Sequence, residues 1–249
     1  MELEPDVCLP DLSGYTMVVP CVSVGNVGQL AVDVLLATLQ PVLLSQMHHP
    51  SLLPVCGADP LSSTSTSLSC AMQLYTHQPA RLAVVQVRSG IIPGQAAHFV
   101  QDLLAWCKQS QVERVVTLTS SFAHERSDKQ LTGSSLRYLA TPGITLGQEF
   151  VMLEQKESFP GLVPGQPVPD QIFLPGSGMA KKLLVMCQDL GLEGVVMSKF
   201  CEEGDNTRDG IELADYLNKW LKWVEGEKYK VPPSWKYLFG PPAPVEMYW

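Results

Sequence analysis

The chain has 249 residues, a net charge of −8 and a pI of about 5.1, and 45% of its residues are hydrophobic. This length and apolar content suffice for one large domain or two small ones with a packed core. The acidic balance argues against a nucleic-acid partner, which needs clustered Lys and Arg. No apolar run reaches membrane-spanning length, and residues 1–6 lack the form of a signal peptide, so we expect neither a membrane location nor secretion.

The cysteines are odd in number and widely spaced, and no Cys-x-x-Cys occurs among them. Because most of them lie in apolar runs, we interpret them as small core hydrophobes in a reducing compartment rather than as disulfides or a zinc site. We therefore expect reduced thiols, no metal and no cofactor. The seven residues are Cys8, Cys21, Cys56, Cys70, Cys107, Cys187 and Cys201.

The first strong pattern is a strand, a glycine turn and a helix within residues 16–39. The turn holds Gly25 and Gly28, and the helix over 27–39 has Asp33 as its only charge. A helix that is apolar all round is buried on more than one side, so it lies between its sheet and either another layer or another chain. The turn lacks the third glycine of dinucleotide loops and the Lys-Ser/Thr pair of nucleotide loops, so its glycines predict close packing rather than phosphate binding.

Further along the chain, apolar runs of strand length alternate with helical spacing. The expected strands are 41–48, 70–75 at a sheet edge, 82–88 as a central parallel strand, 114–120, 136–140 and 194–199. The expected helices are 95–109, 147–155, 176–190 and 207–225. A mobile Ser/Thr-rich stretch over 61–69 and a proline-rich extended loop over 159–169 separate some of them. This alternation predicts a three-layer α/β domain with a mainly parallel sheet.

The last predicted helix carries two apolar stripes. One holds Ile211, Ala214, Leu217, Leu221 and Val224, and the other holds Leu213, Tyr216, Trp220 and Trp223. Asp215 and Lys219 are spaced for an ion pair between them. Two stripes require two packing surfaces, so the helix is either wedged deep in one domain or offers its aromatic face to a partner or to the tail. Tyr216, Trp220 and Trp223 are therefore candidates for a partner interface.

Polar residues that suit catalysis are present but not arranged in a recognised pattern. Ser120, Ser121, His124 and Glu125 follow a strand, where α/β enzymes often place their chemistry, yet the sequence has no Gly-x-Ser-x-Gly elbow. We interpret them as a polar loop. Glu202, Glu203, Asp205 and Asn206 lack the spacing of an EF-hand, so we expect a solvated loop in which Asp205 or Asn206 caps the last helix. His48 and His49 have no carboxylate or cysteine at ligand spacing, which argues against a metal role.

The tail over 231–249 is rich in proline and ends in Met247-Tyr248-Trp249. The first part of the tail is expected to be anchored on the domain by Trp235, Tyr237, Leu238 and Phe239, whereas the later prolines hold the chain extended. Bulky apolar residues at a free terminus either fold back onto the domain or dock elsewhere. We favour a docking peptide with a free carboxylate.

Several stretches together resemble the proteasome assembly chaperone 2 family. The likeness covers most of the chain in the same order and is weakest in 61–69 and 154–168. The stretches are Cys21-Val-Ser-Val-Gly-Asn-Val-Gly-Gln-Leu-Ala31, 82–88, Arg137-Tyr-Leu-Ala-Thr-Pro142, Phe200-Cys-Glu-Glu-Gly-Asp-Asn206, Tyr216-Leu-Asn-Lys-Trp-Leu221 and Pro232-Pro-Ser-Trp-Lys-Tyr-Leu-Phe-Gly240.

This resemblance implies a non-enzymatic chaperone of the cytoplasm and nucleus. Family members pair with proteasome assembly chaperone 1, and the heterodimer promotes assembly of the 20S proteasome α-subunit ring and prevents its off-pathway association. The implied fold is a phosphorylase/hydrolase-like α/β domain over 1–230, followed by an extension over 231–249. Met247-Tyr248-Trp249 matches the hydrophobic–tyrosine–any ending that docks between adjacent α subunits. The alternative is a phosphorylase- or hydrolase-like enzyme that acts on a small molecule.

Overall fold

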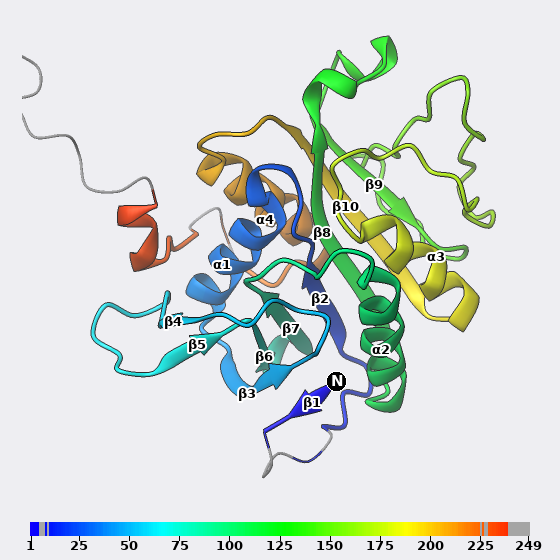
Figure 1. Ribbon diagram of the computed structural model, residues 1–249. Coiled ribbons are helices and arrows are strands. Elements are labelled where there is room, and N and C mark those ends of the chain that lie inside the picture. Colours follow the sequence, from blue (N-terminus) through cyan, green and yellow to red (C-terminus); the bar gives the residue numbers. More distant parts are fainter. Residues whose placement is uncertain (5–7, 9, 225, 227–228, 239–249) are drawn as a thin grey trace, which may run out of the picture.

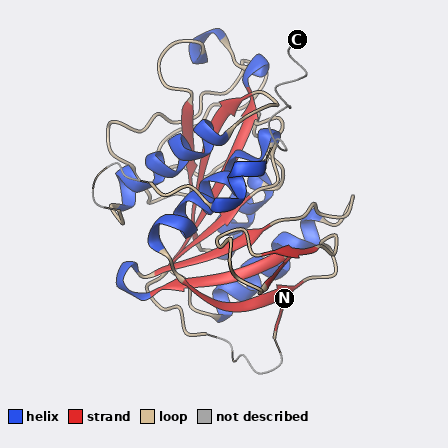
Figure 2. Cartoon of the chain, turned by 90° about the vertical axis from the view of Figure 1, so that its left-hand side faces the viewer, coloured by secondary structure: helices blue, strands red, loops and turns tan. Residues whose placement is uncertain are grey.

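The computed structural model, which describes residues 1–4, 8, 10–224, 226 and 229–238, places one large sheet between two helical layers (Figure 1). The sheet has eight strands in the order β1-β3-β6-β7-β2-β8-β10-β9, and it twists so that the strands at its two ends run in clearly different directions (Figure 2). Its strands are β1 (Glu2–Leu3), β2 (Thr16–Pro20), β3 (Val42–His48), β6 (Met72–His77), β7 (Leu82–Val87), β8 (Arg114–Phe122), β9 (Leu136–Ala140) and β10 (Glu193–Cys201). The helices are α1 (Val27–Leu39), α2 (Ala96–Gln109), α3 (Ala180–Leu190) and α4 (Thr207–Leu221).

The four central strands, β7, β2, β8 and β10, are parallel, which confirms the predicted three-layer α/β class. Antiparallel strands extend this parallel centre on both sides, with β6, β3 and β1 beyond β7 and β9 beyond β10. The predicted edge strand is wrong in its position, because β6 is hydrogen-bonded to β3 and β7 and is therefore internal. The weak apolar alternation of residues 70–75 gives no sign that β3 pairs with the side of β6 that faces away from β7.

Two separate cores hold the layers together. Met17, Val85 and Leu103 belong to the core between the sheet and α2 and α3. Val18 and Leu213 belong to the core on the other face, which α1 and α4 cover. Because successive side chains of a strand point to opposite faces, neighbouring residues such as Met17 and Val18 enter different cores. All six residues of β7 are buried, as expected for a strand covered on both faces.

Glycine sets the distance between α1 and the sheet. A Cβ at Gly28 would lie 2.2 Å from the carbonyl oxygen of Leu118 in β8, and this same oxygen accepts the N–H of Cys21 at 2.8 Å. Gly25, in the turn before the helix, has a φ of 61°, which side-chain-bearing residues rarely adopt. The glycines therefore serve the close packing that their spacing predicted.

The single charge of α1 points into the domain and is paired there. Asp33 is 7% exposed and accepts hydrogen bonds from Arg88 at 2.9 and 3.3 Å and from the Gln86 amide at 2.7 Å. A buried carboxylate that lost these partners would be costly, so the pairing orients α1 relative to the end of β7.

Residues 147–155 are not helical, contrary to the prediction. They form an extended loop with one parallel bridge between Met152 and Tyr138, and Phe150 packs against Tyr216 with ring centroids 4.8 Å apart. The apolar side chains of this segment do not share one face, because Phe150 belongs to the core beneath α1 and α4 and Leu153 belongs to the core beneath α2 and α3. β4 (Cys56–Ala58) and β5 (Leu68–Cys70) form a small two-stranded sheet, of which only Cys70 was predicted to lie in a strand.

The last helix is shorter than predicted and ends at Leu221 rather than at 225. Lys222 turns to a φ of 53°, and its N–H donates to the carbonyl of Asn218. The Asn218 side chain then makes two hydrogen bonds with the backbone of Val224, at 2.8 and 2.9 Å. These side-chain bonds replace the helical ones and close the turn.

Replacing Gly28 with alanine should destabilise the protein, because the added methyl group would meet a backbone oxygen that cannot move without breaking its bond to Cys21. We expect a loss of about 3 kcal/mol in the free energy of unfolding, measured by chemical denaturation. Gly161→Ala is the matched control, since nothing lies within 4 Å of a Cβ at that position. Equal stability of the two variants would contradict this account of the α1 packing.

Candidate interaction surfaces

The last described residues, 229–238, form a strap that crosses α1, coloured orange to red in Figure 1. Tyr229 donates to Asp215 of α4 at 3.1 Å, and the N–H of Lys230 donates to Thr38 of α1 at 2.9 Å. Trp235 packs against the α1/α4 core, as predicted for an anchor, whereas Leu238 is 45% exposed and does not fit that prediction. Phe239 lies outside the described residues. The second layer over α1 therefore comes from α4 and the strap of the same chain.

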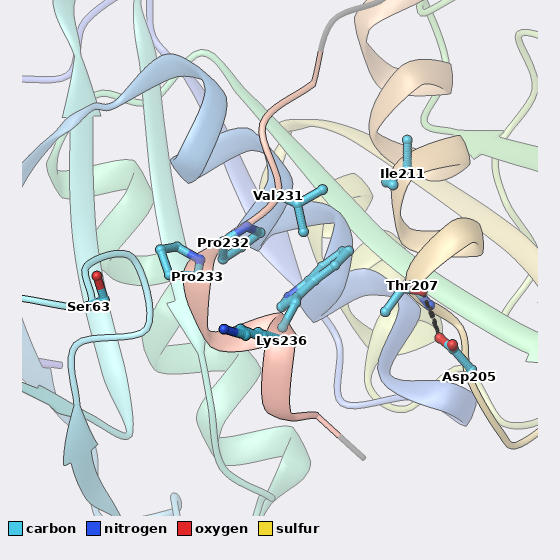
Figure 3. A pocket seen from close by; sticks show the side chains of 9 residues that line it. Ser63, Asp205, Thr207, Ile211, Val231, Pro232, Pro233 and Lys236 are labelled. Carbon is cyan, nitrogen blue, oxygen red and sulfur yellow. Dashed lines mark hydrogen bonds between the residues drawn. The ribbon is translucent and has the colours of Figure 1, made fainter. Parts of the chain in front are cut away.

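A groove of about 710 Å³ lies between the strap and the beginning of α4 (Figure 3). Its apolar lining includes Ile211, Val231 and Trp235, and Figure 3 shows Ser63 and Asp205 at its opposite ends. The indole nitrogen of Trp235 is buried and has no hydrogen-bond partner among the described residues. Val231 is 51% exposed. This surface therefore offers mainly apolar contacts with a few polar groups.

The three aromatic residues predicted as a partner interface differ in exposure. Tyr216 is only 5% exposed, and burial raises the pKa of its hydroxyl to about 12, so it is a core residue of this chain. Trp220 and Trp223 are partly buried at the end of α4. The guanidinium of Arg114 lies 5.2 Å from the centre of the Trp220 ring. The predicted ion pair between Asp215 and Lys219 is present at 2.8 Å. Met247, Tyr248 and Trp249 lie outside the described residues.

A second hollow, of about 590 Å³, lies at the carboxyl ends of β2, β8 and β10. In open α/β sheets this edge is where ligands commonly bind. Glycines line much of it, and their backbones already pack against neighbours. A Cβ at Gly25 would lie 2.3 Å from the Asn206 amide nitrogen, and one at Gly178 would lie 2.4 Å from the Val22 carbonyl oxygen.

The polar residues near this edge engage separate structural partners. Ser120 and Ser121 are fully buried and donate to the carbonyls of Val24 and Pro175. His124 pairs with Glu202 at 3.2 Å, and Glu125 pairs with Lys156 at 2.8 Å. Asp205 accepts the N–H of Thr207 at 3.0 Å just before α4, whereas Asn206 is the N-cap residue and makes no capping hydrogen bond with its side chain. Among the described hydrogen bonds, none joins either serine to His124, so these residues form no nucleophile–base pair.

In the folded chain, His49 lies beside the carboxylate of Asp102, which is distant from it in sequence. His49 Nε2 lies 3.1 Å from Asp102 of α2, and His98 lies 3.6 Å from the same oxygen. The three residues could hold a metal by distance alone. However, His49 Nδ1 accepts the N–H of Ser51 at 3.1 Å, so Nε2 carries the hydrogen and donates it to Asp102. With both nitrogens used, and its ring packed edge-on against Phe99, His49 fits a structural role.

Comparison with known proteins identifies the family of this chain. The model of the PAC2 family matches residues 17–199. This chain belongs to the PAC2 family. Proteasome assembly chaperone 2 of Danio rerio is 36% identical over 251 residues, which cover 95% of this chain and 95% of the relative. The Homo sapiens protein of the same name is 34% identical over 256 residues, which cover 94% of this chain and 96% of the relative.

A solved structure shares the fold of this PAC2-family chain. The crystal structure of Pyrococcus furiosus PbaA, an archaeal homolog of proteasome-assembly chaperone, has a TM-score of 0.64 at 15% identity. The match covers 90% of this chain and 87% of that chain, and it confirms the three-layer architecture. None of the described helices is both long and apolar enough to cross a lipid bilayer.

The stability of this PAC2-family protein should fall as the pH drops below about 6.5. Burial lowers the pKa of His49 from its ordinary 6.5, and the N-terminal ammonium and His98 add to this effect, whereas the hydrogen bond to Asp102 opposes it. As the pH falls, the unfolded chain therefore binds a proton at His49 before the folded chain does, and this favours unfolding. The loss of stability continues until the pH passes the lower pKa that His49 has in the folded chain. Denaturant midpoints measured between pH 7.5 and 5.5 should decrease.

His49→Gln should remove this part of the pH dependence while lowering stability at neutral pH. The matched control is His48→Gln, because the neighbouring His48 side chain is 69% exposed. A pH dependence that is the same in both variants and in the unchanged protein would contradict the assignment to His49.

Proposed function

We propose that this chain is a non-enzymatic proteasome assembly chaperone. In this proposal it pairs with proteasome assembly chaperone 1 in the cytoplasm and nucleus. The heterodimer promotes assembly of the 20S proteasome α-subunit ring and prevents its off-pathway association. The observation that carries the proposal is the 36% identity to proteasome assembly chaperone 2 of Danio rerio along 95% of both chains. The fold shared with PbaA is consistent with it.

The end of α4 is the surface that we assign to the partner chaperone. The strap and β10 already cover other sides of the helix, whereas Trp220 and Trp223 keep part of their surface. Arg114 lies over Trp220 and also pairs with Glu193. Tryptophan and arginine are enriched among the residues that dominate the binding energy of interfaces. Tyr216 would support this surface from inside rather than contact the partner, because it is buried.

Affinity capture of the tagged chain, followed by mass spectrometry, should return proteasome assembly chaperone 1 and α subunits. Trp220→Ala and Trp223→Ala together should weaken capture of the partner chaperone. A central aromatic residue of an interface typically contributes about 2 kcal/mol or more, which is roughly thirtyfold in affinity. Binding of the two purified chaperones, measured by calorimetry, gives the size of the effect.

The control for this experiment is Leu131→Ala, which truncates an apolar side chain that is 56% exposed elsewhere on the domain. It should leave both partners bound. Circular dichroism shows whether the tryptophan variant keeps its fold. Full capture of the partner by a folded tryptophan variant would move the interface to another face, and recovery of neither partner by the unchanged chain would refute the proposed function.

The competing proposal is an enzyme of the phosphorylase or hydrolase type. The observation in its favour is the hollow at the carboxyl ends of the parallel strands. Against it, Ser120 and Ser121 donate to backbone carbonyls, and His124 and Glu125 are paired elsewhere. A site for acyl or phosphoryl chemistry needs such groups to converge on one reacting atom. Their dispersal among the described residues therefore supports the chaperone.

We further propose that Met247-Tyr248-Trp249 docks between adjacent α subunits through its aromatic ring and terminal carboxylate. The tail acts together with the globular surface, so that each contact raises the effective concentration of the other. Support for this proposal comes from the sequence of the ending and from the strap. The strap is bound to the domain through Thr38, and eleven residues, 239–249, follow it in the sequence.

Deleting Met247-Tyr248-Trp249 should lower the affinity of the heterodimer for α-subunit assemblies without abolishing it. Tyr248→Ala should reproduce most of this loss, about thirtyfold, because its ring is the expected anchor. Residues appended after Trp249 should do similar harm by moving the carboxylate. Binding of purified heterodimer, measured by surface plasmon resonance, checks these outcomes.

Val245→Ala is the control within the tail, since it truncates an apolar residue outside the ending. It should bind like the unchanged chain. If the deletion and Tyr248→Ala both bind with unchanged affinity, the globular surface is the whole interface and the tail has no docking role.

A further inference from the structure

Two cysteines face each other across the small β4–β5 sheet. Cys56 is directly opposite Cys70 in the antiparallel register, and both thiols are free. Cys56 is exposed and Cys70 is partly exposed. The two residues are fourteen positions apart in sequence, and only Cys70 lies in a segment that was predicted as a strand. Only the hairpin brings them together.

The register gives this pair the geometry of a disulfide. Directly opposed residues of an antiparallel ladder have Cα atoms about 4.5–5.5 Å apart, and disulfides require about 4.4–6.8 Å. The bond therefore needs side-chain rotation and little movement of the backbone. Burial raises the pKa of the Cys70 thiol, and the neighbouring Cys56 raises it further.

The other cysteines lack this combination of exposure and a nearby thiol. Cys21, Cys107, Cys187 and Cys201 are buried, and burial raises the pKa of each thiol, to about 12 for Cys21. A thiol that stays protonated and inaccessible reacts slowly with oxidants. Cys8 is exposed, but it is not opposite another cysteine in any described strand.

We propose that Cys56 and Cys70 are a redox modification site that forms a reversible disulfide by exchange with a small disulfide such as oxidised glutathione. The exposed Cys56 loses its proton, and its thiolate attacks one sulfur of glutathione disulfide. That S–S bond breaks, and the first glutathione leaves as a thiolate and takes up a proton. Deprotonated Cys70 then attacks the Cys56 sulfur and releases the second glutathione. The protein thus loses two electrons and two protons, which the two glutathiones gain.

The bond would fix one wall of the groove beneath the strap. The loop between the cysteines carries Pro60, whose carbonyl accepts the N–H of Ser234 at 3.3 Å. It also carries Leu61, which packs against the α1/α4 core, and Ser63, which lines the groove. Closing this loop covalently restricts its motion. The oxidation state of the pair therefore controls how firmly this wall supports the strap.

Peptide mapping of the full-length protein tests the proposal. The protein is equilibrated with glutathione buffers of increasing oxidation, quenched with acid, alkylated and cleaved before aspartate. This cleavage separates the two cysteines, because Asp59 lies between them, and yields peptides 33–58 and 59–101, each with a single cysteine. We expect these two peptides joined in near-stoichiometric yield, and separate again after dithiothreitol. The oxidised protein should also melt a few degrees higher than the reduced protein.

Cys70→Ser should abolish the joined peptides and the melting shift, and should leave Cys56 as a mixed disulfide with glutathione. Cys8→Ser is the matched control and should behave like the unchanged protein. Three outcomes would overturn the proposal: both thiols still free in the most oxidising buffer, a stable glutathione adduct on Cys56 beside free Cys70, or a bond from either cysteine to another position or to a second chain.

Discussion

The contact between Gly28 and the carbonyl oxygen of Leu118 is the constraint on which the layering of this protein depends. The missing side chain lets α1 lie directly on β8, at the middle of the parallel strands. At that distance the apolar surface of α1 fills the space above the sheet, and α4 can pack beside it into the same core. The pairing of Asp33 with Arg88 then orients the helix, because a buried carboxylate is stable only where its partners are.

The sheet and α4 together do not cover the whole surface of α1. The remaining surface is covered by the strap, which follows the last helix and is held by hydrogen bonds to Thr38 and Pro60. The strap therefore completes the domain and at the same time builds a groove against the beginning of α4.

The carboxyl edge of the sheet carries polar groups and glycines that already have partners within the domain. Its serines, histidine and acids are spent on internal contacts, such as those of Ser121 with Pro175 and of Glu202 with His124. Its glycines are needed for packing, as Gly178 is against Val22. Polar groups that already have fixed partners hold loops in place and are poorly placed to meet a reacting atom. The geometry thus agrees with a binding role.

Local pattern was enough to predict the four helices and the strands β2, β3, β7, β8, β9 and β10, because their apolar spacing and the glycine turn report burial directly, and the quoted motifs indicated the family. Tertiary structure decided the rest. The internal position of β6, the loop around Phe150, the pairing of Cys56 with Cys70 and the bond from His49 to Asp102 each join residues whose partners lie elsewhere in the chain. A single sequence records how apolar a segment is and which turn it allows. It does not record which distant segment will satisfy its hydrogen bonds and cover its surface. The pairing of distant segments in the folded chain formed the groove beside the strap and the surface at the end of α4.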